Sequence, residues 1–237
     1  MTLDELFRIS PYGLSASEKE RALSENLTAL TRRHYDNCLE YRKILDVLGY
    51  DPSRAYASAE LPFIPVRLFK NYELRSVPQD QIVKTLTSSG TSGQAVSRIF
   101  LNADNVRSQS KALNEIISSF IGKQRLPLLL LDTEMIKKDR SMYSARGAGI
   151  IGFSIFGRNS VYALDAGMKL DVEKVTAFCE RHAEEPILMF GYTYMIWQFV
   201  VRVLEEIGHR FYMKNAVLFH IGGWKKLKDQ AVNALEF

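Results

Sequence analysis

The chain has 237 residues, 46% of them hydrophobic and 24% charged, which is ordinary for a globular protein with a sizeable buried core. Its 31 Lys and Arg against 27 Asp and Glu give a net charge of +4, and these basic residues are scattered along the chain. That pattern argues against a nucleic-acid binder and favours a small anionic ligand. No apolar run is long enough to span a bilayer, the start does not resemble a signal peptide, and only two cysteines are present. We therefore expect a cytoplasmic protein with neither a membrane span nor a disulfide framework.

The first sixty residues predict a helical segment. Ser15 and Glu18 have the spacing of a capping box, and leucines follow at helical intervals. This pattern then ends, and the prolines of Leu61–Val66 require an extended backbone there. We place a boundary between an N-terminal helical segment, residues 1–60, and the rest of the chain, residues 61–237.

From residue 82 onward, short β-rich runs alternate with longer helical ones. The alternation predicts an α/β fold with a mainly parallel sheet layered with helices. The expected strands are 82–87, 98–101, 126–131, 187–190 and 216–221, and the expected helices are 103–121, 172–182, 194–207 and 228–235. The last of these helices runs towards the end of the sequence without a cap, a glycine or a polar tail. We therefore expect the chain to be truncated from a longer polypeptide.

The segment Thr87-Ser88-Ser89-Gly90-Thr91-Ser92-Gly93-Gln94 carries the most specific signal in the sequence. Gly90 and Gly93 permit backbone conformations closed to other residues, so main-chain N–H groups can approach a ligand closely. The loop also carries four hydroxyl donors, Ser88, Ser89, Thr91 and Ser92. Such a loop can wrap a polyphosphate, although it is neither a Walker A loop nor a dinucleotide fingerprint. A flexible surface linker is the alternative, which the position between two β-prone runs disfavours.

The run Ser88–Gly93 resembles the phosphate-binding signature of adenylate-forming enzymes, the superfamily of acyl-CoA synthetases, luciferases and peptide-synthetase adenylation domains. Within that superfamily, nearly the whole chain resembles the acyl-protein synthetases, or long-chain fatty acid–luciferin-component ligases. Three further stretches carry this narrower resemblance: Leu61-Pro62-Phe63-Ile64-Pro65-Val66-Arg67-Leu68-Phe69-Lys70, Ser144-Ala145-Arg146-Gly147-Ala148-Gly149 and His220-Ile221-Gly222-Gly223-Trp224-Lys225-Lys226-Leu227. The resemblance implies the N-terminal large domain of such an enzyme, with residues 61–237 as a partial adenylation, or ATP-binding, domain.

The resemblance implies an enzyme that uses ATP and Mg²⁺ to convert a fatty or other organic carboxylate into an acyl-adenylate and then passes the acyl group to a thiol. It also implies an acyl-CoA-type reductase or a carrier protein as a partner. The Glu-bearing Mg²⁺ motif and the catalytic lysine of the family have no counterpart here, so we expect these 237 residues to bind ATP weakly and turn over poorly alone. Two alternatives stay open, an acyl- or aryl-CoA ligase fragment and a catalytically degenerate scaffold module with the same fold.

Several further residues are candidate ligand contacts. Gly222 and Gly223 follow an expected strand, where open α/β sheets bind ligands, and match the family turn that flanks adenine. By resemblance, His220 borders the acyl pocket. From its position after the expected strand 187–190, we expect Tyr192 to border the substrate, and Trp224 is a candidate to pack against a bound ring. The alternatives are a strand-ending turn for the glycines, and packing or core roles for the three aromatic side chains.

Other features depart from the family or allow a purely structural explanation. Val96 stands where many superfamily members carry a lysine, and Arg98 is the nearest cation that could replace it at the phosphates. An exposed strand charge is the alternative for Arg98. The mixed small and aromatic residues of 146–149 and 152–157 suit an acyl tunnel, but close packing of a helix on the sheet explains them better. Cys179, with Arg181 and His182 beside it, is better explained as a core residue than as a reactive thiolate, and the resemblance places the acceptor cysteine elsewhere.

Overall fold

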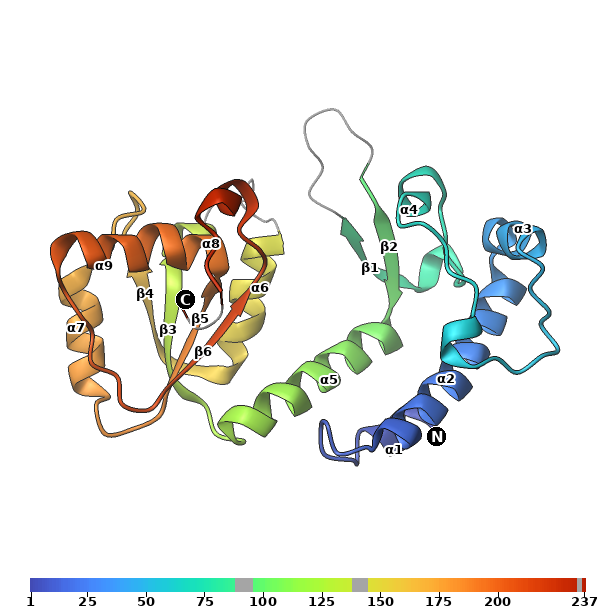
Figure 1. Cartoon of the computed structure of the whole chain (residues 1–237), viewed down its shortest axis with the longest axis horizontal. Helices are drawn as coiled ribbons and strands as arrows, with labels where there is room; N and C mark the ends of the chain where they lie inside the picture. The colour runs from blue at the N-terminus through green and yellow to red at the C-terminus, as the bar shows by residue number, and fades with distance from the viewer. Residues whose placement is uncertain (88–95, 138–144, 234–235) are drawn as a thin grey trace. The chain divides into compact units, whose positions relative to one another are not determined.

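The computed structural model describes residues 1–87, 96–137, 145–233 and 236–237 (Figure 1). The chain divides into two compact units, Met1–Gly122 and Lys123–Phe237. The boundary expected from the sequence, at residues 60–61, lies within the first of these units. Within the part of the chain that is described, no helix combines the length and the apolar character needed to cross a membrane.

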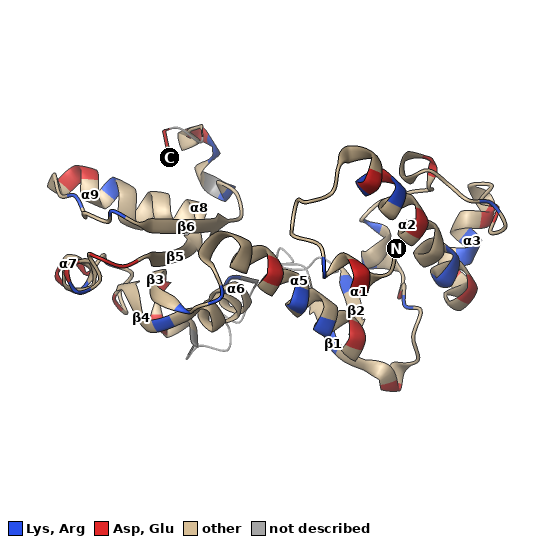
Figure 2. Ribbon diagram, turned by 90° about the horizontal axis from the view of Figure 1, so that it is seen from below, with Lys and Arg blue, Asp and Glu red and all other residues tan. Residues whose placement is uncertain are grey.

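The first unit begins with helices, as the sequence predicts. The capping box is present, since the Ser15 hydroxyl accepts from the Glu18 N–H at 3.3 Å and the Glu18 carboxylate accepts from the Ser15 N–H at 2.9 Å. Buried Leu45, Tyr50 and Tyr56 form a small core against these helices. The elements up to residue 81 are α1 (Leu3–Leu6), α2 (Ala16–Asn37), α3 (Leu39–Val47), η1 (Ser58–Glu60), α4 (Leu68–Asn71) and η2 (Gln79–Gln81). Figure 2 shows acidic and basic residues interspersed along α2 and α3.

The first unit also contains a two-stranded antiparallel sheet. Strand β1 (Ile82–Thr87) pairs with β2 (Arg98–Asn102), and Thr87 lies opposite Arg98. Both strands were predicted, but they form a sheet of their own and take no part in the parallel one. Helix α5 (Ala103–Ile121) follows, capped by the Asn102 side chain, which accepts from the Asn105 N–H at 2.9 Å.

The second unit is built on a parallel sheet of four strands, which confirms the predicted fold class. The strands are β3 (Leu126–Thr133), β4 (Gly157–Leu164), β5 (Ile187–Tyr192) and β6 (Ala216–Ile221), in the order β4-β3-β5-β6. The sequence did not predict β4. Its second to fourth residues, Arg158, Asn159 and Ser160, are polar and exposed, so only half of the strand carries an apolar pattern.

Helices cover both faces of this sheet (Figure 1). On one face Phe153 of α6 stacks on Phe190 of β5, with ring centroids 3.8 Å apart. Neighbouring strand residues point to opposite faces, and Met189 faces α7 to α9. The bounds are η3 (Glu134–Lys137), α6 (Ala145–Phe153), η5 (Ser154–Phe156), α7 (Val172–Arg181), α8 (Thr193–Ile196), the π-helix η6 (Trp197–Val201), α9 (Arg202–Ile207) and η7 (Lys225–Gln230).

The helix predicted over residues 228–235 is wrong. A 3₁₀-helix, η7, ends at Gln230, and Ala231 has an extended backbone with φ −66° and ψ 128°. Of the described residues 228–233, all except Val232 have exposed side chains. A short helix gains most of its stability from burying an apolar face, and a stretch without that burial does not hold an α-helix on propensity alone.

Candidate functional site

The connections of the parallel sheet define one place where a ligand site is expected. From β3 the chain crosses to β4 on one side, whereas from β5 it crosses to β6 on the other. The two crossovers diverge between β3 and β5, and open α/β sheets bind ligands in the crevice at the carboxyl ends of such a pair. Thr133 ends β3 and Tyr192 ends β5, so these residues mark the candidate site.

A buried ion pair lies at this carboxyl edge. Asp132, near the end of β3, has no exposed surface, and Arg146 comes from the first turn of α6. Arg146 Nε donates to Asp132 Oδ2 at 2.8 Å, and Arg146 Nη2 donates to Asp132 Oδ1. The Thr133 N–H also donates to Asp132 Oδ1, at 2.7 Å. Its hydrogen bond with Asp132 raises the pKa of Arg146, so the pair is held in its charged, bidentate form.

Tyr192 is enclosed by two glycines from different elements. A Cβ added to Gly149 of α6 would lie 2.5 Å from the Tyr192 hydroxyl, and one added to Gly222 would lie 3.2 Å from its ring. Gly222 also has φ +81°, which other residues rarely adopt. Burial raises the pKa of Tyr192, and a smaller contribution comes from Tyr194. The phenol therefore stays protonated and fixed between α6 and the turn after β6.

Thr193 ties the start of α8 to the end of β6. Its buried hydroxyl lies 3.0 Å from His220 Nδ1, 3.1 Å from the Gly222 carbonyl and 3.3 Å from the Ile221 carbonyl. A hydroxyl has one proton and two lone pairs, so it can donate to one carbonyl while accepting from His220. The hydrogen bonds of the Thr193 hydroxyl therefore fix the Gly222–Gly223 turn beside the carboxyl end of β5.

Aromatic side chains complete the edge. His220 is exposed and stacks on Phe237, with centroids 4.8 Å apart. Trp224 packs edge-on against Trp197, with ring centroids 5.3 Å apart. Lys225 Nζ lies 4.4 Å from the centroid of the Tyr194 ring, within the range of a cation–π contact. The edge thus combines flat rings, open glycine backbone and cations, a combination that suits a planar anionic ligand.

Comparison with protein families decides the identity. The model of the family described as acyl-protein synthetase, LuxE, matches residues 2–237. The chain belongs to the acyl-protein synthetase family. No curated protein matches it. The resemblance seen in the sequence is therefore confirmed at the level of the family.

The structure of this acyl-protein synthetase family member brings some predicted site residues together. Its second unit places five of them at one edge of the sheet: Tyr192, His220, Gly222, Gly223 and Trp224. Arg98 lies in the first unit, where it is exposed at the start of β2 and makes no ion pair with any residue that the structure describes. The phosphate-loop residues Ser88, Ser89, Gly90, Thr91, Ser92 and Gly93 lie outside the described residues.

Three residues at the carboxyl edge of the parallel sheet were not predicted as site residues. These are Asp132, Thr193 and Arg146. Arg146 had been noted only in a stretch that carries the family resemblance and in a segment for which packing was preferred to an acyl tunnel. Asp132 and Thr133 directly follow a run of buried leucines, and a carboxylate at the end of a buried strand was the available signal. The ion pair itself joins residues 14 positions apart across a strand and a helix, which no local pattern reports.

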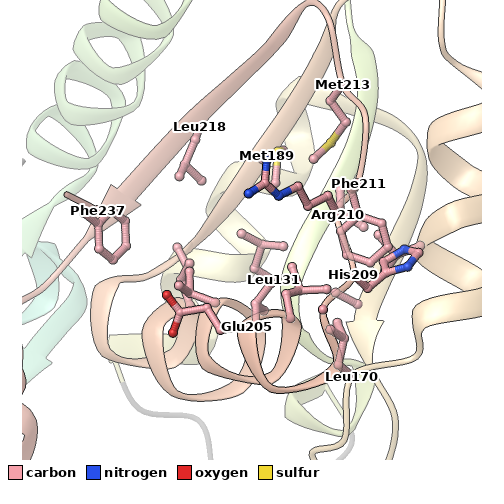
Figure 3. Close-up of a pocket in the computed structure, with 18 residues that line it drawn as sticks. Leu131, Leu170, Met189, Glu205, His209, Arg210, Phe211, Met213, Leu218 and Phe237 are labelled. Carbon is pink, nitrogen blue, oxygen red and sulfur yellow. The ribbon is translucent and has the colours of Figure 1, made fainter. Parts of the chain in front are cut away.

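A separate apolar pocket of about 590 Å³ lies on the face of the parallel sheet opposite α6, towards α8 and α9 (Figure 3). Leu131, Met189 and Leu218 form part of its wall, and Arg210 also lines it. None of the predicted site residues that the structure describes lines this pocket.

The two cysteines of this family member lie in its interior. Burial raises the pKa of the Cys179 thiol, so the neutral thiol is favoured over the thiolate. Cys38 is also buried, with its sulfur 3.8 Å from the Glu40 carboxylate. These surroundings suit packing better than nucleophilic chemistry.

Proposed function

We propose that this chain forms the nucleotide- and acid-binding part of an enzyme that activates a fatty or other organic carboxylate with ATP. The membership of the acyl-protein synthetase family, over residues 2–237, is the observation that carries the proposal. The phosphate-loop sequence Ser88–Gly93 and the residues gathered at the carboxyl edge of the parallel sheet support it.

The reaction needs two transfers. First, a carboxylate oxygen of the acid attacks the α-phosphorus of ATP, the bond from that phosphorus to the pyrophosphate oxygen breaks, and pyrophosphate leaves. A thiol then attacks the acyl carbon of the acyl-adenylate, loses its proton and expels AMP. The protein's task in the first step is to hold the acid beside the nucleotide and to stabilise the charge that develops on pyrophosphate.

The described residues fit a nucleotide base at the Gly222–Gly223 turn. A Cβ added to Gly223 would meet nothing within 4 Å, and Gly222 lies against the ring of Tyr192. The turn therefore presents flat, open backbone with aromatic rings close by, which would admit adenine. From its sequence alone, the run Ser88–Gly93 is proposed to bind phosphate through its hydroxyls and backbone N–H groups, with Arg98 as an additional cation.

Mg²⁺ is proposed as the companion of ATP. Within residues 1–87, 96–137, 145–233 and 236–237 no three His, Cys, Asp or Glu side chains gather as a metal site. Mg²⁺ is commonly held by substrate phosphates with only one or two protein carboxylates. The ion would therefore enter with the nucleotide, where it would neutralise phosphate charge.

The acyl acceptor is proposed to be a thiol outside the two buried cysteines of this chain. Both Cys38 and Cys179 are enclosed, and the raised pKa of Cys179 disfavours its thiolate. A cysteine of another protein, a carrier protein or CoA would serve, and an acyl-CoA-type reductase is the partner that the family implies. Adding each acceptor in turn and identifying the acyl product would distinguish them.

Nucleotide binding is the direct test, because it does not depend on turnover. The protein is titrated with ATP and Mg²⁺ by calorimetry, as wild type and as a Thr91→Ala/Ser92→Ala variant. We expect saturable binding that falls about thirtyfold or more in the variant, since each of the two lost donors to a phosphate is worth on the order of 1 kcal/mol or more.

Ser160→Ala is the matched control, because this serine is exposed on β4 and far in sequence from the loop. ATP affinity that is undetectable in wild type, or that ignores the loop substitutions, would contradict the proposed function. Acid-dependent exchange of labelled pyrophosphate into ATP then tests the chemical step in a preparation that binds.

A further inference from the structure

The ion pair at the carboxyl edge is oriented with its positive end towards solvent. The side chain of Asp132 is 0% exposed, whereas that of Arg146 is 18% exposed. The carboxylate is thus held behind the guanidinium, and water or a ligand reaches the guanidinium first. Such a pair is neutral overall but acts as a dipole that attracts an anion to its outer end.

A second cation lies on the same edge. Tyr194 forms a hydrogen bond with Arg146 that contributes to the raised pKa of Arg146. On the same tyrosine ring, Lys225 Nζ lies 4.4 Å from the centroid. Two cations from different elements, the first turn of α6 and the segment after β6, therefore meet at Tyr194.

Stability alone does not account for a buried ion pair at this place. Removing two charges from water is costly, and apolar side chains of similar volume commonly stabilise a fold as well or better. The neighbouring strand positions Leu128 and Leu130, on the same face of β3 as Asp132, are both apolar and fully buried. An apolar residue at position 132 would continue this pattern. The carboxylate of Asp132 therefore indicates a role in ligand binding, at the point where the strand meets the ligand crevice.

We propose that Arg146 binds the carboxylate of the acid substrate and that Asp132 is a positioning residue that fixes its guanidinium. The assignment rests on the proposed function, because it names the residue that holds the acid in that reaction. A guanidinium carries five N–H donors in a fixed plane. Asp132 accepts from Nε and Nη2, Nη2 also lies 3.9 Å from Met168 Sδ, and Tyr194 forms a further hydrogen bond, so the substrate carboxylate would join a polar cluster that is already formed. A planar donor edge matches a carboxylate geometrically, which a flexible ammonium does not.

The test compares acids with alcohols of equal length and needs no turnover. Binding of straight-chain acids, from octanoate to tetradecanoate, and of the corresponding primary alcohols is measured by calorimetry without ATP. We expect wild type to bind each acid about tenfold or more tightly than its alcohol, because a hydrogen bond to a charged group adds that much affinity. An Asp132→Asn/Arg146→Gln variant, which removes both charges together, should bind acid and alcohol equally.

A second ion pair supplies the matched control. Arg158 at the start of β4 pairs with Glu185, just before β5, at the opposite end of the strands. The Arg158→Gln/Glu185→Gln variant should keep the wild-type preference for acid. Arg146→Lys, which keeps the charge and leaves Asp132 paired, should retain only part of the preference. It serves as the decisive variant if the double substitution at 132 and 146 does not fold by circular dichroism.

Three results would overturn the assignment. The first is an unchanged preference for acid in the 132/146 variant, or in Arg146→Lys if that variant does not fold. The second is an equal loss of acid and alcohol binding. The third is a loss confined to ATP affinity, which would place a phosphate at Arg146. Failure of ATP to bind wild type at all contradicts the proposed function instead. The two failures are therefore separable, because acid recognition is measured in the absence of nucleotide.

Discussion

The backbone of Gly149 in α6 lies against the hydroxyl of Tyr192 in β5, so closely that a Cβ at position 149 would come within 2.5 Å of that oxygen. Tyr192 is 7% exposed and cannot move aside freely. This approach joins α6, which carries Arg146, to the strand that ends at the ligand crevice. The glycine is therefore required by packing, although it weakens the helix that contains it.

Gly149→Ala should destabilise the second unit by about 1–3 kcal/mol, because the added methyl group overpacks a filled site. Gly152→Ala in the same helix should instead stabilise by about 0.5–1 kcal/mol, since its Cβ would meet nothing within 4 Å. Urea unfolding followed by tryptophan fluorescence measures both, as the two tryptophans, Trp197 and Trp224, lie in the second unit.

The same contact allows an internal rescue. In Gly149→Ala/Tyr192→Phe the hydroxyl is absent, and the new Cβ would face the ring carbon Cζ at 3.4 Å, an ordinary contact distance. The double variant should be more stable than the sum of the two single effects indicates. Additive effects would show that the clash with the hydroxyl is not the cause.

Gly222→Ala should lower the free energy of unfolding by about 1–2 kcal/mol, because φ +81° is unfavourable for residues with a Cβ. The added Cβ would also press on Tyr192 Cδ1 at 3.2 Å. Gly223→Ala is the natural control, since its Cβ would meet open space. Equal losses in the two variants, measured by urea unfolding, would argue against a conformational role specific to Gly222.

Sequence patterns predicted the elements whose local signal agrees with their burial. All eight positions of β3 are buried, and its first six residues are uninterruptedly apolar, so the strand could be predicted. Helix α6 was not predicted because Gly147, Gly149 and Gly152 lower its intrinsic propensity. The stack of Phe153 on Phe190 and the fit of Gly149 to Tyr192 stabilise it instead, and these are contacts between distant segments.

The residues of the candidate site likewise fall into those with a local sequence signal and those that only the fold brings together. The glycine turn at 222–223 was predicted because glycines after an apolar strand carry a local meaning. Asp132 and Arg146 were not, because one comes from a strand and the other from a helix, and only the fold brings their charges together. The role of Thr193 likewise depends on β6, which follows it by more than twenty residues.

His34 should make the stability of the first unit depend on pH. Burial lowers the pKa of this histidine, with a smaller effect from the charge of Arg33, and its Nδ1 lies 2.6 Å from the Ser76 hydroxyl. The folded state therefore favours neutral His34, while the unfolded chain takes up a proton near pH 6.5. The stabilisation is fully present above that pH and is lost as pH falls through the lower, folded-state pKa.

Urea unfolding followed by circular dichroism from about pH 8 to about pH 5 checks this prediction. The difference in unfolding free energy between wild type and His34→Gln should shrink as the pH falls. His209→Gln, in the second unit, makes the same chemical change away from these surroundings. A difference that stays constant over the pH range would contradict a buried, neutral His34.

Thr193→Val should loosen the carboxyl end of β6 from α8. Valine keeps the shape of threonine but leaves His220 Nδ1 and the Gly222 carbonyl without the hydroxyl that now lies 3.0 and 3.1 Å from them. We expect a loss of about 0.5–1.5 kcal/mol in the free energy of unfolding, because a partly buried hydrogen bond is lost. Thr193→Ser, which retains the hydroxyl, should lose far less. If the valine variant unfolds at the same urea concentration as wild type, the hydroxyl does not hold the glycine turn in place, and the turn must be fixed by Tyr192 packing alone.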